Sequence, residues 1–211
     1  MKRTLYAILL LFLSVTTLTA QTPIRQWFVT MPDSITPLLT KNDRLDFIDF
    51  IDSHMSAVVT NRLDGKSRMT QLTDDYIHIE YTPISDITMK LLPVSDTTRI
   101  LCMVTTMKTA VRDSRISFYS EGWKPLRANK LFSEPRMKQF FTDEPNDSAL
   151  QARQKLDIYF KTYSLSPQDN TLTCRLTTLD FLSAADREAV KPYVREELNY
   201  DWNGAKFIIR K

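Results

Sequence analysis

Between Ala57 and Ser120, apolar residues tend to recur at every second position, and short turn sequences interrupt this alternation repeatedly. A period of two places successive side chains on opposite faces of an extended strand. Turns this short can join only antiparallel neighbours, because parallel strands need a crossover of a dozen or more residues. The pattern therefore predicts an antiparallel meander. Its six strands are expected at 57–63, 66–73, 76–82, 86–93, 98–107 and 114–120.

A helix is predicted before the meander, from about Asn42 to Met55, because apolar residues recur there at helical spacing. Asn42 or Asp43 is placed to cap it. The row expected to face the core consists of Leu45, Ile48, Ile51 and Met55. A brief helix over 33–39 should come earlier, with Asp33 or Ser34 as its cap.

The elements after residue 120 are shorter. A closing hairpin is predicted over 116–126, helical turns over 133–141 and 149–155, and strands at 156–160 and 172–179 around a turn at 164–170. Ser183 to Asp186 resembles a capping box and begins a helix that reaches about Val194, which Pro192 should kink or shorten. Asn203-Gly204 marks a last hairpin between 198–202 and 206–210.

These elements predict an α+β fold with a largely antiparallel, curved sheet and helices on one face. We expect a first α+β half at 21–127 and a second at 128–211, packed as one unit. The passage 95–106 aligns with 167–178, with few identities. This alignment leaves two possibilities, a pair of degenerate helix-plus-meander repeats or a chance match.

The first residues have the pattern of a secretion signal. Lys2 and Arg3 precede an uncharged apolar run over 5–18, and small residues end at a cut site after Ala20. The run is shorter than the roughly 20 apolar residues that cross a bilayer. We therefore expect residues 1–20 to be a cleavable signal peptide, a periplasmic or secreted protein, and no integral membrane segment after cleavage. No cysteine follows the cut site directly, so we do not expect a lipoprotein.

Charge and glycine content argue against two classes of function. The chain has 28 basic and 25 acidic residues, and no Lys/Arg run stands out, so nucleic acid is not an expected partner. The only glycines are Gly65, Gly122 and Gly204, each in the context of a tight turn. None is left for a phosphate-binding loop or a nucleophile elbow, and we expect no cofactor.

Cysteines, histidines and carboxylates provide no recognisable catalytic or metal motif. Cys102 and Cys174 could form a disulfide in an oxidising compartment, or could be two buried thiols. His54 is expected to be packed and His78 to lie on a polar strand face, without metal-ligand spacing. The acidic residues on the first long helix are best explained as a solvated face. We therefore assign no catalytic residue and no metal site.

Aromatic residues are concentrated in the two closing hairpins, and they are the candidate interaction residues: Tyr119, Trp123, Tyr200 and Trp202. Large aromatics are enriched at the centres of interfaces and in carbohydrate or peptide grooves. Tyr200 and Trp202 lie on one face of a strand and could form a paired platform. The alternative is cross-strand packing in the core, the usual fate of large aromatics.

Several structural motifs resemble a family of secreted Bacteroidales proteins of unknown function. They are the helix segment 44–52, Leu72 to Tyr76, Met89 to Pro93, and Phe118 to Leu126. The resemblance covers most of the chain after the signal, and it implies no catalytic residue. The helix-plus-meander plan is also similar to β-lactamase-inhibitor-protein-like domains, on architecture alone.

We therefore predict a non-catalytic binding or interaction protein of the cell envelope. Its partner would be an envelope protein or a glycan. Two alternatives stay open: a hydrolase that acts on envelope polymers, with a site assembled from distant residues, and an inhibitor of a secreted enzyme. The second alternative follows only from the likeness of fold.

Overall fold

The computed structural model describes residues 23–142 and 146–210. The predicted signal segment lies outside these residues. Two helices lead into the first sheet, α2 (Pro23–Thr30) and α3 (Lys41–Asp52). Thr40 caps α3 in place of the predicted Asn42 or Asp43. Its hydroxyl accepts a hydrogen bond from the Asp43 amide at 3.2 Å, and the Asp43 carboxylate accepts one from the Thr40 amide at 2.7 Å. Each side chain thus satisfies the other residue's backbone, as in a capping box.

The buried face of α3 differs from the predicted one. Arg44, Phe47 and Ile48 are buried, whereas Leu45 and Met55 are 39% and 58% exposed. The guanidinium of Arg44 donates to two backbone carbonyls of the preceding loop, at 2.8 and 2.6 Å. An arginine that is satisfied in this way can occupy a core position. The sequence pattern counted it as polar and therefore included Leu45 and Met55 in the core row, whereas Ile48 is buried as predicted.

The predicted helix over 33–39 is wrong. This segment forms turns, and its backbone is bonded across the sheet edge instead. The Leu38 amide donates to the hydroxyl of Tyr81 at 2.8 Å, and the Leu38 carbonyl accepts from the Arg62 amide at 3.0 Å. These long-range hydrogen bonds satisfy the N–H and C=O groups of Leu38, which a helix would have paired within itself.

The predicted meander is confirmed. Six strands pair in sequence order, each antiparallel to the next. They are β1 (Val58–Thr60), β2 (Lys66–Leu72), β3 (Tyr76–Thr82), β4 (Ser85–Pro93), β5 (Arg99–Lys108) and β6 (Arg112–Tyr119). The first sheet ends at β6, beyond which the chain makes a short return: Tyr119 bridges to Pro125, and the Leu126 amide donates to the Phe118 carbonyl at 2.9 Å.

The rest of the chain builds a second antiparallel sheet of four strands, in the order β10-β9-β8-β7. Its strands are β7 (Lys161–Leu165), β8 (Thr171–Leu176), β9 (Glu197–Trp202) and β10 (Phe207–Ile209). The last hairpin is confirmed. The helices are α4 (Ala128–Leu131), α5 (Asp147–Gln154) and α6 (Ala184–Val190), with short 3-10 turns η1 (Glu121–Trp123), η2 (Met137–Gln139), η3 (Thr178–Phe181) and η4 (Lys191–Tyr193).

Three predicted elements of this half are displaced. The helix expected at 133–141 is replaced by α4 and η2, and the helix expected to end near Val194 ends at Val190, with Pro192 in the 3-10 turn η4. The strand expected at 156–160 forms at 161–165. Here the buried residues alternate as Lys161, Tyr163 and Leu165. The sequence pattern missed this strand because the buried residue Lys161 is basic and interrupts the alternation of apolar residues.

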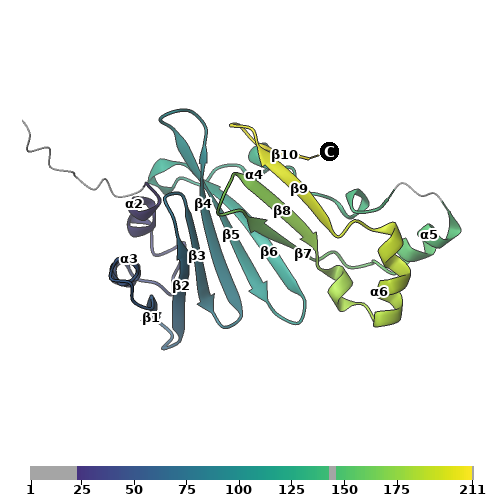
Figure 1. Ribbon diagram of the computed structural model, residues 1–211, viewed down its shortest axis with the longest axis horizontal. Helices are drawn as coiled ribbons and strands as arrows, with labels where there is room; N and C mark the ends of the chain where they lie inside the picture. Colours follow the sequence, from purple (N-terminus) through teal and green to yellow (C-terminus); the bar gives the residue numbers. More distant parts are fainter. Residues whose placement is uncertain (1–22, 143–145, 211) are drawn as a thin grey trace, which may run out of the picture.

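The first sheet is covered on both faces, which gives the fold its layers (Figure 1). One buried cluster joins α2 and α3 to inward residues of the first sheet such as Ile77, Met89 and Leu101. The other joins the opposite face, with Cys102 and Phe118, to the second sheet. The α+β architecture with largely antiparallel sheets is therefore confirmed. Helices α2 and α3 cover one face, and the second sheet lies against the other together with residues of α4, α5 and α6. This second cluster draws residues from both sides of residue 127; the division of the chain there stays a prediction.

Cys102 and Cys174 are both buried, and both are free thiols. The thiol alternative therefore holds in this structure, and the disulfide does not. Each cysteine lies on the strand where the predicted repeat places it, β5 and β8. The repeat itself stays a prediction.

Candidate functional site

The aromatic candidates of the first hairpin pack among themselves and against α2. Trp123 is 7% exposed, and its ring lies 5.4 Å from that of Tyr119 and 5.8 Å from that of Trp27, measured between centroids. Trp123 has a φ of 63°. The three rings close the end of the helix-covered core, where edge-on contacts add to apolar burial.

Tyr200 and Trp202 do share a face of β9, and that face is turned towards the first sheet. Tyr200 is 2% exposed and lies 5.1 Å from the ring of Phe132. The indole of Trp202 donates to the Pro93 carbonyl on β4 at 2.6 Å. These side chains hold the two sheets together. A role of the four aromatics in partner contact stays a prediction, and the site described next does not depend on it.

The histidines and acidic residues lie apart. His54 is exposed at the end of α3 with a φ of 55°, so its expected packed position is wrong, while the Nδ1 atom of His78 lies 2.6 Å from the Thr70 hydroxyl. Asp46 and Asp49 are exposed. Within residues 23–142 and 146–210, no group of three or more His, Cys, Asp or Glu side chains is arranged to hold a metal ion.

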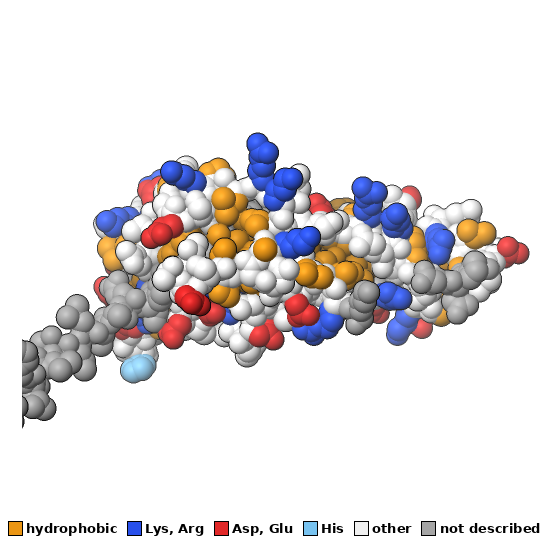
Figure 2. All heavy atoms as spheres, turned by 90° about the horizontal axis from the view of Figure 1, so that it is seen from above, with side chains coloured by type: hydrophobic (Ala, Val, Ile, Leu, Met, Phe, Trp, Pro, Cys, Tyr) orange, Lys and Arg blue, Asp and Glu red, His pale blue; other side chains and the backbone are white. Residues whose placement is uncertain are grey.

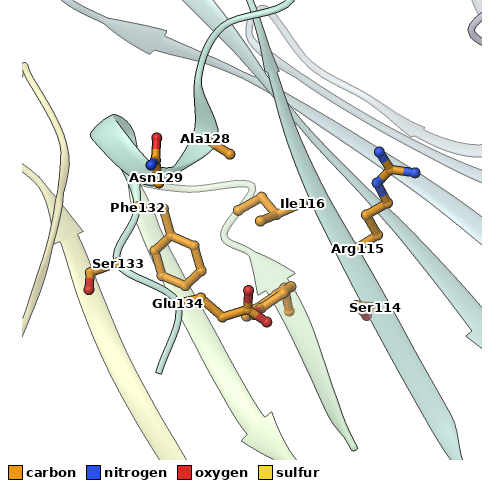
Figure 3. Close-up of a pocket in the computed structure, with 9 residues that line it drawn as sticks. Ser114, Arg115, Ile116, Ala128, Asn129, Phe132, Ser133 and Glu134 are labelled. Atoms are coloured by element: carbon orange, nitrogen blue, oxygen red, sulfur yellow. The ribbon is translucent and has the colours of Figure 1, made fainter. Parts of the chain in front are cut away.

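A groove of about 470 Å³ opens where the two sheets meet, between β6, α4 and β7. We call it the β6 groove. Its lining comes from two stretches of the chain and one strand residue: Ser114, Arg115, Ile116, Ala128, Asn129, Phe132, Ser133, Glu134 and Tyr163. Figure 3 shows Ile116 and Phe132 facing each other across the opening, with the Glu134 carboxylate beside them. Arg115 points away, to the other face of the sheet (Figure 3). The groove thus combines apolar walls with one acidic group.

An ion pair anchors the acidic side of the groove. The ammonium of Lys161 lies 2.6 Å from Oε1 of Glu134, and the same oxygen accepts from the Tyr163 hydroxyl at 3.3 Å. The Lys161 side chain is 11% exposed and that of Glu134 is 60% exposed. The ammonium also lies 4.7 Å from the centre of the Tyr159 ring, within cation–π range. The ion pair and the hydrogen bond both use Oε1 of Glu134, so Oε2 is outside these two contacts.

Burial keeps the protons on the groups beneath the groove. It raises the pKa of the Tyr163 hydroxyl far above its ordinary value, and the neighbouring Cys174 and Glu134 raise it further. Burial raises the pKa of the Cys174 thiol to about 12. Both groups are therefore neutral near pH 7, and Tyr163 acts as a hydrogen-bond donor to Glu134.

The backbone of β6 forms one wall of the groove. Ser114, Arg115 and Ile116 all line it. Since neighbouring side chains in a strand point to opposite faces, three consecutive residues can border one groove only along the edge of the strand. The carbonyls of Phe118 and Arg112 accept bonds from outside the β5–β6 pair, from the Leu126 amide at 2.9 Å and the Thr177 hydroxyl at 2.6 Å. The even-numbered residues of β6 therefore direct their N–H and C=O groups away from β5.

Ser114 and Ile116 lie between these two tied ends. Their outward N–H and C=O groups have no hydrogen-bond partner within the described part of the chain. A row of unpaired backbone groups at a sheet edge is a template for another strand. The β6 groove therefore offers main-chain hydrogen bonds along one wall and apolar contact on the other.

Sequence reasoning did not find Ile116, Phe132, Glu134 or Lys161 as site residues. The one signal that could have found part of the site is the Tyr-x-Lys-x-Tyr alternation of 159–163, which places a lysine among aromatic residues on one strand face. The free edge of β6 has no sequence signal, because it depends on where the second sheet lies.

The fold and the groove define an α+β domain with two antiparallel sheets. The model of the family "Protein of unknown function (DUF3256)" matches residues 15–207, and the chain belongs to this family. A solved structure of a domain of an uncharacterized protein from Porphyromonas gingivalis W83 is similar, with 27% identity and a TM-score of 0.78. The match covers 89% of this chain and 98% of that one. No curated protein matches the chain.

These matches support the predicted resemblance to a Bacteroidales family of unknown function. The likeness to β-lactamase-inhibitor-protein-like domains stays a prediction. Among the described residues, no helix has the length and the apolar content needed to span a membrane. Figure 2 shows one face of the molecule, on which basic and acidic side chains alternate around a central apolar area.

Proposed function

We propose that this protein is an exported, non-catalytic binding protein of the cell envelope that holds a protein partner in the β6 groove. Export, to the periplasm or beyond, rests on residues 1–20 alone. The observation that carries the binding site is the open edge of β6: a groove whose wall is unpaired main chain fits a polypeptide better than a glycan or a small metabolite. Neither the hydrolase nor the inhibitor alternative has a comparable observation among the described residues.

The groove is large enough to hold a short segment of a protein ligand. Its volume of about 470 Å³ falls within the range of roughly 300–1,000 Å³ of ligand pockets. It is open at the surface, and its apolar residues Ile116, Ala128 and Phe132 lie opposite the main-chain wall. A short stretch of a larger partner can therefore enter, while the rest of that partner stays outside.

An affinity capture with groove-filling variants tests the proposal. Residues 21–211 serve as bait in an envelope extract of the source organism, with mass spectrometry as readout. Ala128→Arg places a long side chain in the groove, whereas Ala184→Arg makes the same change at the first residue of α6, an exposed position. We expect one stoichiometric partner that Ala128→Arg loses and Ala184→Arg keeps. A partner captured equally by both variants, or no partner at all, contradicts the proposed function.

A further inference from the structure

We propose that the partner binds by strand addition: an extended segment pairs with the free edge of β6 and becomes a seventh strand of the first sheet. This inference rests on the proposed function, and it specifies the ligand as main chain in the β conformation. The two ends of the open stretch define its length. At one end, the Leu126 amide donates a hydrogen bond to the Phe118 carbonyl. At the other end, the Thr177 hydroxyl donates one to the Arg112 carbonyl.

The open stretch offers both donors and acceptors to an incoming strand. Ser114, which is 6% exposed, and Ile116, which is half-buried, each direct an N–H and a C=O group into the groove, and a strand that enters beside them satisfies all four. On the side that faces β5, the backbone of β6 is already paired: Arg115 lies opposite Thr105, and Ser117 lies opposite Met103. The six-stranded sheet therefore provides a fixed template, and ordering of this edge costs the protein little when the ligand binds.

The groove also determines which side chains the segment carries. An incoming residue that faces the second sheet would insert between Ile116 and the ring of Phe132, which favours an apolar side chain. Side chains two residues apart share a face. The neighbouring position on that face then lies beside Glu134, whose Oε2 atom is outside its contacts with Lys161 and Tyr163. A lysine or arginine fits there, so the segment has an apolar and a basic residue separated by one residue.

The segment is taken to come from another protein, because two β6 edges do not complement each other. The described edge residues of this chain's β6 read Ser114, Arg115, Ile116, and their basic residue lies next to the apolar one, on the opposite face. Pairing of two β6 edges therefore cannot bring a basic side chain from that stretch to Glu134. Self-association is instead an outcome that the test must detect.

Hydrogen exchange of the free protein gives the first test. We expect the Ile116 amide to exchange at least on the order of tenfold faster than the Ser117 amide, whose N–H faces β5. Equal protection of the two amides would show that the Ile116 N–H is already bonded, which would overturn the proposal.

The second test uses synthetic seven-residue peptides as probes. Each has threonine at alternate positions, with Val-Thr-Lys, Leu-Thr-Lys or Phe-Thr-Lys at its centre, or the reverse order. We expect at least one peptide to shift the amide signals of 114–118 and to slow exchange of the Ile116 amide about tenfold at saturation. Methylation of the peptide's backbone nitrogens at either odd or even positions separates main-chain from side-chain contact. One of the two methylated series should lose binding, and the other should retain it.

Proline substitutions in the protein give a matched pair. Ile116→Pro removes an outward N–H from β6 without removing a bond to β5, and Ile209→Pro does the same at the free edge of β10. We expect Ile116→Pro to weaken peptide binding at least tenfold, Ile209→Pro to leave it unchanged, and Ile116→Ala, which keeps the N–H, to fall between them.

Three results would overturn strand addition. They are no binding by any of the probes, equal binding by both methylated series, and a dimer of residues 21–211 in light scattering that Ile116→Pro dissociates, since the edge would then serve self-association. If Ile116→Pro keeps an envelope partner that Ala128→Arg loses, strand addition fails while the proposed function stands. If both variants keep it, the proposed function fails as well.

Discussion

The ion pair beneath the β6 groove leads to a prediction about stability. Lys161 is almost fully buried and Glu134 is mostly exposed, so the two partners should respond unequally to substitution. Glu134→Gln keeps the shape and the acceptor oxygen but removes the charge opposite a buried ammonium. Lys161→Met removes the buried charge and returns Glu134 to solvent. We therefore expect Glu134→Gln to be the more harmful substitution.

The magnitude follows from the burial of the two groups. Breaking a fully buried pair by removing one partner costs about 3–5 kcal/mol, whereas an exposed pair contributes about 0–1 kcal/mol. With one partner buried and two aromatic rings still near the ammonium, we expect Glu134→Gln to lower the free energy of unfolding by about 1–2 kcal/mol. For Lys161→Met, relief from ammonium desolvation offsets the lost ion pair, and the change should stay within about 0.5 kcal/mol.

Urea unfolding of residues 21–211 at pH 7, followed by tryptophan fluorescence, measures both effects. With a slope of about 2 kcal/mol per molar urea, Glu134→Gln should move the midpoint down by about 0.5–1 M at constant slope. The double variant should be as stable as Lys161→Met. Glu121→Gln is the control, because Glu121 is exposed and has no ion pair among the described residues. If Lys161→Met is destabilised as much as Glu134→Gln, the argument from unequal burial is refuted.

Three further predictions concern the contacts between layers and the titratable groups. Trp202→Phe removes the indole bond to the Pro93 carbonyl and should lower unfolding free energy by about 0.5–1.5 kcal/mol in the same urea assay, with no change disproving the bond. Because Cys102 and Cys174 are free and buried, with raised pKa values, an aromatic disulfide reagent at pH 8 should detect two thiols only after unfolding; a native protein that reacts at once contradicts this. The hydrogen bond from Arg44 lowers the pKa of Asp33 in the folded protein. The ionised Asp33 therefore contributes to the free energy of unfolding above its unfolded pKa near 3.9, and this contribution is lost as pH falls through the folded pKa. Below about pH 4, the urea midpoint of Asp33→Asn should therefore decrease less steeply with falling pH than that of the unsubstituted protein. The same pH dependence in both proteins would refute this.

Most of the first sheet could be predicted because its information is local. Strands β2 to β5 lie within one residue of their predicted bounds, and the turn residues between them allow only antiparallel neighbours. The same reasoning placed the last hairpin and the cap of α6 at Ser183. It failed at Arg44 and Lys161, where a basic side chain occupies a buried position. In both cases the chain supplies distant or loop-borne oxygen partners that no local pattern contains.

The candidate site could not be predicted for a related reason. The sequence indicated that Tyr200 and Trp202 share a strand face, but whether that face meets solvent or another sheet depends on residues about a hundred positions away, such as Pro93. Likewise, Ile116 reads as an ordinary strand residue. Its edge is free because β7 pairs with β8 and lies across the face of the first sheet.

The sequence by itself determined the strands of the first sheet, their antiparallel order and the last hairpin, since these depend on a period and on turn chemistry within a few residues. Only the tertiary structure decided that a second sheet covers the face opposite α2 and α3, that Tyr200 is buried and Trp202 half-buried between the sheets, and that the backbone of β6 lines a groove beside Glu134. The physical reason is that periodicity specifies which side chains share a face, whereas the layer that covers each face is selected by apolar burial and hydrogen bonding between distant segments.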